Sequence, residues 1–389
     1  MHKLQSSSAA KLAKIFIRLS SRSKSTGGRP SAPLGSRFLT NPDDIFKHNM
    51  WDHVQWTEED KENAQQKAEE NSCVKIPLKE QGKFDTEACQ YWDKFYGMHQ
   101  NKFFKDRKWL FLEFPELLPS GAKSQATNTC LGDQQAAYPP PTGSSTDTET
   151  KHQPPSPSHH HRSTDTSDHQ EPRLEKDEAA TQTPTFPGQH ASFKILEVGC
   201  GVGNSVFPIV NSIKETNAFL YCCDFSPCAI QLVKDHPDYD DSVCHAFVHD
   251  ICEEMASFPF PPHSLDVILT VFVLSSIHPD RIQGVVNRLS TYLKHGGIFL
   301  FRDYGRYDFS QLRFKKGRCL SENFYTRGDG TCVYFFTKEE VHGLFSNAGL
   351  EEVQNLEDRR LQVNRGKKVA MHRVWMQSKY RKLHPPSPS

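Results

Sequence analysis

A glycine-rich turn between an apolar segment and a helical one constrains this chain most. The run FKILEVGCGVGN places Gly199, Gly201 and Gly203 directly after a strand predicted over residues 193–198. Glycines at alternate positions permit backbone conformations closed to other residues and allow close approach of a ligand, while the helix that comes next offers free N–H groups. The turn indicates a nucleotide-binding α/β fold, although alone it is a weak signal.

Apolar runs of strand length alternate with helix-length segments from Ser192 onward. This rhythm is typical of a doubly wound parallel sheet with helices on both faces. The predicted strands cover residues 193–198, 219–224, 246–249, 265–271 and 298–302, and the helices 204–213, 226–235 and 281–295. A helix at 338–348 and strands at 351–355 and 371–375 complete the pattern.

Acidic residues stand at the carboxyl ends of two of these strands. Asp224 can accept both hydroxyls of a ribose, and Asp250 can accept an adenine amino group, with Ile251 covering the ring. Val271 ends the fourth strand, and we expect it to line the same pocket. Glu197, two residues before Gly199, favours the cationic cofactor S-adenosylmethionine, and NAD is the cofactor left to exclude.

Composition sets outer limits on function. Lys+Arg and Asp+Glu both total 47, so attraction to an anionic partner must come from local clusters of charge. The eleven cysteines show no repeated CxxC pair, which argues against a disulfide framework and against a structural zinc site, and no metal is expected. No apolar run approaches the roughly 18 residues of a membrane span.

Five segments are predicted along the chain. Residues 1–34 are basic, serine-rich and amphipathic, which is typical of a mitochondrial presequence, a basic RNA-contacting tail being the alternative. Residues 35–119 are predicted to be helical, with one helix beginning after Thr57. Residues 120–188 are too polar to form a core and are predicted to be a disordered insertion. Residues 189–382 form the Rossmann-like domain, and 383–389 a disordered tail.

Basic side chains interleaved with aromatic ones suggest an RNA partner. Phosphates attract such clusters, and aromatic rings stack on exposed bases. Three clusters stand out, at KFFKDRKW, LRFKKGR and the basic segment after Asp358. The candidate contacts are Lys105, Arg107, Arg313, Lys315, Lys316, Arg359, Arg360 and Arg365.

The residues after the fourth strand constrain the acceptor atom. The sequence there is LSSIHP, which lacks the Asn/Asp-Pro-Pro-aromatic run used by methyltransferases acting on exocyclic amines, and it holds no cysteine nucleophile for a ring carbon. A ring nitrogen needs neither device, only placement in a dry pocket. Open alternatives are a methyltransferase with a protein or small-molecule acceptor, an RNA-binding protein without catalysis, and an interaction scaffold.

The chain resembles the methyltransferase-like tRNA N3-methylcytidine methyltransferases, most of all the mitochondrial member. The resemblance rests on SRFLTNPDDIFKHNMWDHVQW, YWDKFYGMHQNKFFKDR, ILEVGCGVGNSVFP, VFVLSSIHPD, FRDYGRYD, RGDGT and QVNR. It implies a class I Rossmann-like S-adenosylmethionine-dependent methyltransferase with a helical N-terminal lid and tRNA-binding extension. By the family pattern, the cofactor contacts fall on Trp92, Tyr96, Gly201, Asp224, Asp250, Ile251 and Val271, with Gly199 in the same turn.

The same resemblance implies a substrate and a compartment. The expected reaction methylates N3 of cytosine 32 in the anticodon loop of mitochondrial threonine and serine tRNAs, in the matrix. A cytosolic paralogue acting on threonine or arginine tRNAs is the alternative, and a seryl-tRNA synthetase is left open as a partner. Asp303, in FRDYGRYD, is our candidate catalytic carboxylate for stabilising the cationic product ring.

Overall fold

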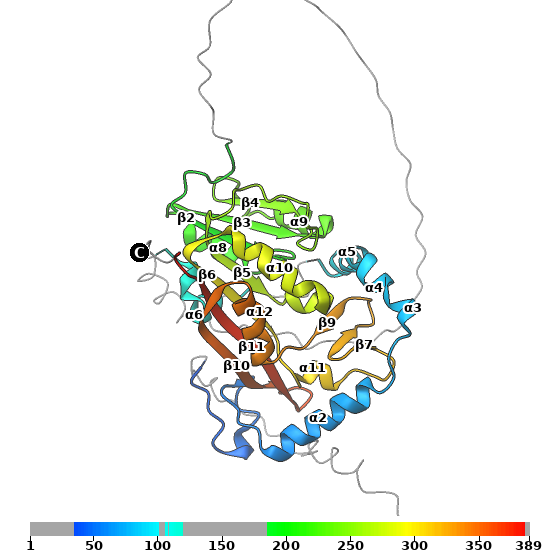
Figure 1. Ribbon diagram of the computed structural model, residues 1–389. Coiled ribbons are helices and arrows are strands. Elements are labelled where there is room, and N and C mark those ends of the chain that lie inside the picture. Colours follow the sequence, from blue (N-terminus) through cyan, green and yellow to red (C-terminus); the bar gives the residue numbers. More distant parts are fainter. Residues whose placement is uncertain (1–34, 101–105, 108, 120–184, 386–389) are drawn as a thin grey trace, which may run out of the picture.

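The computed structural model describes residues 35–100, 106–107, 109–119 and 185–385 (Figure 1). The predicted presequence, most of the predicted insertion, Lys105 and the last four residues lie outside the described residues. Figure 1 shows a large central sheet with helices on both of its faces. This arrangement is the α/β class that the sequence predicts.

The central sheet has eight strands in the order β1-β10-β11-β6-β5-β2-β3-β4. Five neighbours pair in parallel: β2 (Phe193–Val198), β3 (Ala218–Asp224), β4 (Cys244–Val248), β5 (Leu265–Val271) and β6 (Leu293–Tyr304). The others are antiparallel: β1 (Met50–Trp51), β10 (Leu350–Asn364) and β11 (Val369–Lys382). The chain proceeds outward from β2 through β3 to β4 and then returns to β5 on its other side. Ligands in such sheets bind where the order reverses, outside the carboxyl ends of β2 and β5.

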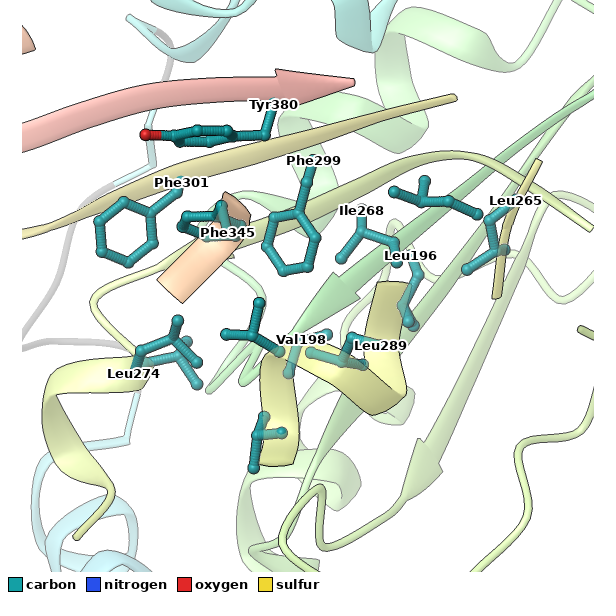
Figure 2. Packing of buried hydrophobic residues seen from close by; sticks show 14 of the residues in the cluster. Leu196, Val198, Leu265, Ile268, Leu274, Leu289, Phe299, Phe301, Phe345 and Tyr380 are labelled. Carbon is teal, nitrogen blue, oxygen red and sulfur yellow. The ribbon is translucent and has the colours of Figure 1, made fainter. Parts of the chain in front are cut away.

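Each face of the sheet is covered by its own helices. One face packs against α10 (Pro279–Tyr292) and α12 (Lys338–Asn347), and the other against α8 (Val206–Ile213), α9 (Pro227–Lys234) and the segment with α6 (Leu110–Glu113) and η4 (Pro115–Leu117). Figure 2 shows the first of these two cores, where Phe299 and Phe301 of β6 lie beside Phe345 of α12 and Leu289 of α10. The buried ring of Tyr380 stacks on Phe345 with centroids 4.5 Å apart.

The helices begin where the sequence supplies capping groups. Thr57 and Thr337 each accept a hydrogen bond from the third helical N–H, and Asp60 and Glu340 return it in capping boxes. The predicted helix after Thr57 is therefore confirmed, as α2 (Glu58–Ser72). Residues 35–119 are termed the N-terminal block. In it, η2 (Pro42–Asp44) precedes α2, and α3 (Leu78–Gln81), α4 (Lys83–Thr86) and α5 (Ala88–His99) follow it.

A small second sheet was not predicted from the sequence. It consists of β7 (Cys319–Ser321), β8 (Phe324–Thr326) and β9 (Cys332–Tyr334), preceded by α11 (Phe309–Leu312), and η5 (Leu274–Ser276) lies between β5 and α10. The N-terminal block contacts it directly, since Ile76 N donates to Cys319 O at 2.8 Å. The block also contributes β1 to the main sheet, so it is attached to both sheets.

Part-buried ion pairs fix the segment 109–118 to the sheet. Glu113 accepts from Arg360 Nη2 at 2.7 Å and from Gln377 Nε2 at 2.6 Å, and Glu116 pairs with Lys379 at 2.8 Å. Each charge that leaves water here needs a partner, because an unpaired buried charge is strongly destabilising. These pairs tie the last described part of the N-terminal block to β10 and β11.

The described cysteines are all free thiols. Cys200, Cys222, Cys223 and Cys244 are buried behind the glycine turn, with Cys222 Sγ 3.8 Å from Cys244 Sγ. Hydrogen bonds with Cys200 and Cys244, together with burial, raise the pKa of Cys222 well above its ordinary value, and burial does the same for Cys223. These thiols are therefore protonated packing groups in the folded protein.

Candidate functional site

A cavity lies at the point where the strand order reverses. Its walls come from the ends of β2, β3 and β5, from the loop after β4, and from α5, η5 and β8. They include Trp92, Tyr96, Gly199, Asp224, Asp250, Ile251, Phe272, Val273, Ser276, His278 and Phe324. The sequence-predicted cofactor residues are thus largely brought together by the fold.

Gly199 of the glycine turn lines the cavity, and the turn has no room for side chains. Gly199 has φ +61°, and a Cβ atom there would lie 2.5 Å from Val273 Cγ2. Gly201 has φ +53°, and a Cβ there would lie 2.9 Å from the Tyr96 hydroxyl. Both positions combine a left-handed backbone with close approach of a neighbour, which only glycine tolerates well. The turn is shaped as a cradle for a ligand.

Asp224 joins this turn to the next strand. Its carboxylate accepts from Gly201 N at 2.9 Å and from Ser226 N at 3.0 Å. Burial raises the pKa of Asp224 to about 6, and the two backbone hydrogen bonds oppose the rise. At neutral pH the group is a fixed anionic acceptor at the cavity wall, as holding the hydroxyls of a ribose requires.

Asp250 and Ile251 line the cavity from the loop after β4. Asp250 is exposed and its Oδ1 accepts from Cys252 N at 2.8 Å, while Ile251 is half-buried. The neighbouring His249 has its pKa lowered to about 4, first by burial and then by the charge of Arg288. The imidazole beside Asp250 is therefore neutral at pH 7.

Helix α5 covers the cavity with two aromatic rings. Trp92 and Tyr96 lie one turn apart, with centroids 5.7 Å apart and planes inclined by 29°. Asp93 holds the helix in place, because its carboxylate accepts from the Ser226 hydroxyl and from Cys228 N at 3.3 Å. Asp93 was not a sequence-predicted residue, and no spacing in the sequence distinguishes it.

Glu197 provides a buried acid beneath the turn. Arg107 Nη1 lies 3.8 Å from its Oε1 and donates to Ser205 Oγ at 2.8 Å. Burial raises the pKa of Glu197 to about 7 despite the Arg107 charge. Oε2 has no hydrogen-bond partner among the described residues. The unpartnered oxygen of this buried acid fits a cationic ligand bound at the glycine turn.

Three predicted site residues, Gly201, Val271 and Asp303, do not line the cavity. Gly201 instead lies against the Tyr96 hydroxyl and donates its N–H to Asp224. Val271 is buried among the residues under α8 and α9, because side chains alternate along β5, and the next residues, Phe272 and Val273, line the cavity instead. Asp303 is fully buried and accepts from Ser275 N at 3.0 Å and from Tyr304 N at 2.9 Å. It therefore holds η5 in position and does not itself face the cavity.

The predicted RNA contacts divide into exposed and buried side chains. Arg313, Lys315 and Lys316 are exposed between α11 and β7, and Arg365 is exposed at the β10–β11 turn. Arg107 is held at Glu197, and half-buried Arg359 pairs with Glu357 at 2.9 Å over the Trp56 ring. The prediction for Arg360 is corrected, because it is 7% exposed and pairs with Glu113, Asp358 and Asp52.

Phe272 is one of several cavity residues that sequence reasoning missed. It has φ +61°, a conformation rare for a bulky residue, and its ring contacts Tyr304 with centroids 4.9 Å apart. Strained backbone of this kind concentrates at functional sites. Its position, directly after the last strand residue, is the only sequence signal that could have found it.

No group of three or more His, Cys, Asp or Glu side chains that could hold a metal ion occurs within residues 35–100, 106–107, 109–119 and 185–385. None of the helices in those ranges is long and apolar enough to cross a membrane.

The comparisons with known proteins agree with this geometry. The family described as a methyltransferase domain matches residues 196–299. The tRNA N(3)-cytidine methyltransferase METTL2 of Danio rerio is 51% identical over 357 residues, which cover 91% of this chain and 90% of the relative. METTL2B of Homo sapiens is 50% identical over 358 residues, covering 89% and 93%. The tRNA N(3)-cytidine methyltransferase METTL8, mitochondrial, of Mus musculus is 46% identical over 260 residues, covering 66% and 91%.

A cradle that excludes side chains, an anionic acceptor on the second strand and the methyltransferase-domain match together define a class I methyltransferase that uses S-adenosylmethionine. The predicted fold and cofactor are confirmed. Because relatives near 50% identity span nine-tenths of both sequences, the chain belongs to the family of tRNA N(3)-cytidine methyltransferases. The predicted family is confirmed as well.

Proposed function

We propose that this chain transfers the methyl group of S-adenosylmethionine to N3 of a cytosine in tRNA. The observation that carries the proposal is the cavity at the reversal of strand order, formed in a chain whose relatives are named for this reaction. In the proposed complex, Asp224 accepts the ribose hydroxyls, Asp250 accepts the adenine amino group, and the rings of Trp92 and Tyr96 cover the ligand.

The cofactor supplies an electrophilic methyl group when bound, and the protein has only to place the acceptor. Cytosine N3 carries its lone pair at neutral pH, so no general base is required. We infer that the loop base leaves its stack and enters beside Phe272 and Phe324, aromatic side chains on the cavity wall. Such rings stack on a base and keep water from the reacting atoms.

Asp303 takes a positioning role in this scheme. Its carboxylate receives the Ser275 N–H, and Ser276 of the same short helix lines the cavity. Helix η5 lies between Asp303 and the proposed position of the base. Asp303 therefore orients η5 and does not contact the product ring.

The finer substrate is proposed from the family resemblance. We propose cytosine 32 of the anticodon loop in mitochondrial threonine and serine tRNAs, with residues 1–34 directing import. The alternative is a cytosolic enzyme acting on threonine or arginine tRNAs. One observation favours this cytosolic alternative. The METTL2 relatives, whose names mention no mitochondrion, align with about nine-tenths of the chain, whereas the mitochondrial METTL8 aligns with 66% of it. A seryl-tRNA synthetase as partner belongs to the first alternative.

The test is transfer of labelled methyl from S-adenosylmethionine to purified tRNA, with nucleoside analysis of the product. We expect label in 3-methylcytidine with the wild-type chain and none with Asp224→Ala, which loses the ribose acceptor while tRNA still binds. Label in protein, or none in RNA, would overturn the proposal. Mitochondrial and cytosolic tRNA pools supplied separately, and a fluorescent fusion lacking residues 1–34, distinguish the two compartments.

A further inference from the structure

The helices that cover the cavity are held with unequal strength. Helix α5 is fixed along its length, because Asp93 accepts hydrogen bonds at the start of α9 and the ring of Tyr91 packs against Gly330, where a Cβ atom would lie 2.5 Å from that ring. The preceding helices α3 and α4 have four residues each and begin after Pro77 and Gly82, which have no side-chain group that could cap a helix. Short helices without caps open more readily than a packed one, so α4 is the weakly held part of the cover.

Helix α4 is attached on two sides. Phe84 packs against Leu320 and Phe324, which belong to the small sheet of β7, β8 and β9. Its neighbour Asp85 forms an ion pair with Arg281 of α10, whose Nη1 donates to Oδ1 at 3.0 Å and to Oδ2 at 3.2 Å. The side chains of Asp85 and Arg281 are 43% and 41% exposed, and both residues line the cavity. The ion pair therefore lies at the rim, between the cavity and the solvent.

The same guanidinium holds the loop that carries Asp250. Arg281 Nη2 donates to Cys252 O at 3.1 Å, and Cys252 N donates to Asp250 Oδ1 at 2.8 Å. A planar guanidinium presents its donors in a fixed fork, so it can hold two acceptors at set positions where an ammonium group would hold them less precisely. Arg281 thus joins α4, α10 and the loop after β4 at one point of the rim.

We propose that Asp85 and Arg281 form a latch that controls the exchange of S-adenosylmethionine and of its demethylated product, S-adenosylhomocysteine. This inference goes beyond the proposed function, since it concerns the adenosine-bearing ligand whatever the methyl acceptor is. With the ion pair formed, α4 closes the rim beside Asp250 and Ile251, to which we assign the adenine. With the pair broken, α4 turns outward about the contact of Phe84 with the small sheet, and the ligand can leave. An exposed ion pair stabilises only weakly, so it can break and form again in every catalytic cycle.

The test compares Asp85→Asn and Arg281→Gln with the matched variant Glu58→Gln. Glu58 pairs with Lys61 at 2.7 Å within α2, so the control also loses an exposed ion pair, but one whose residues do not line the cavity. Release of S-adenosylmethionine and of S-adenosylhomocysteine is measured separately, by stopped-flow tryptophan fluorescence. We expect Asp85→Asn to release both ligands about two- to fivefold faster than wild type, which is the contribution of an exposed ion pair. Arg281→Gln should release them at least as fast, because it also frees Cys252 O, and Glu58→Gln should match wild type.

Three further measurements separate a latch from an ion pair that only supports the fold. In the double variant Asp85→Asn/Arg281→Gln, release should be no faster than in Arg281→Gln alone, because the pair is already lost. Raising the salt concentration should speed release from wild type and leave release from Asp85→Asn nearly unchanged, since salt screens exposed charges. In the ligand-free protein, the amides of α4 should exchange hydrogen faster in Asp85→Asn than in wild type, and Glu58→Gln should show no change there.

Release at the wild-type rate in both Asp85→Asn and Arg281→Gln would overturn the proposal. So would an equal acceleration of release in Glu58→Gln, or a fall in the Tm of Asp85→Asn without faster release. A wild-type chain that binds and releases the cofactor in this way but transfers no methyl to tRNA would contradict the proposed function and leave the latch intact, so the two failures are distinguishable.

Discussion

Replacing Arg360 with Met tests whether this arginine belongs to the fold or to the RNA surface. Arg360 is 7% exposed, and its guanidinium donates to Glu113 at 2.7 Å and to Asp358 at 2.9 Å and lies 3.5 Å from Asp52. Met matches its apolar stem but removes the charge. Asp358 would keep Arg302 and Glu113 would keep Gln377, whereas the buried Asp52 carboxylate would lose its only arginine partner among the described ion pairs.

Breaking a buried ion pair from one side costs about 3 to 5 kcal/mol, which corresponds to a fall in Tm of roughly 6 to 20 °C for a domain of this size. Urea unfolding and calorimetry of Arg360→Met measure this loss. The control is Arg365→Met, where the side chain is exposed and we expect a change within ~0.5 kcal/mol. The reasoning is refuted if Arg360→Met unfolds within about 1 kcal/mol of wild type and instead reduces the salt dependence of tRNA binding.

Three further outcomes are expected at the site. Gly199→Ala places a Cβ atom 2.5 Å from Val273 Cγ2 at φ +61°, so calorimetric titration should show S-adenosylmethionine affinity falling by about 1 to 3 kcal/mol; unchanged affinity would contradict the cradle. Phe272→Leu removes the ring beside the acceptor, so kcat should fall while cofactor affinity is kept, and Phe272→Tyr should restore kcat. Burial raises the pKa of Asp303 to about 6, so the native state holds this proton more tightly than the unfolded chain does. Its contribution to stability, about 3 kcal/mol, is fully present only below about pH 4 and is lost as pH rises through 6, and Asp303→Asn should flatten that part of the urea midpoint curve.

The parts of the site that sequence could predict are those set by local chain geometry. Glycines after a strand and acids at strand ends have one natural location in a parallel sheet, so Gly199, Asp224 and Asp250 were placed together correctly. Val271 was misplaced because the last strand residue points into a core, and the chain turns into the cavity only at Phe272.

The basic clusters were harder to interpret because charge alone does not say which way a side chain points. Arg359 and Arg360 are neighbours in one run, but successive strand residues face opposite sides, so Arg359 lies over Trp56 while Arg360 is buried. The acids that bury Arg360 come from distant parts of the chain, Asp52 and Glu113, and no local pattern announces them. The small sheet of β7, β8 and β9 was missed because its strands have three residues each.

The shielded thiols behind the glycine turn give the molecule a native reporter of its own breathing motions. Cys222 and Cys223 have no exposed surface and belong to the strand that ends at Asp224. An alkylating reagent can reach them only when that strand edge opens, so their modification rate counts local opening events. Binding of S-adenosylmethionine should slow this alkylation by the factor by which it reduces opening of the strand. Mass spectrometry of the alkylated protein then measures ligand occupancy without any engineered label.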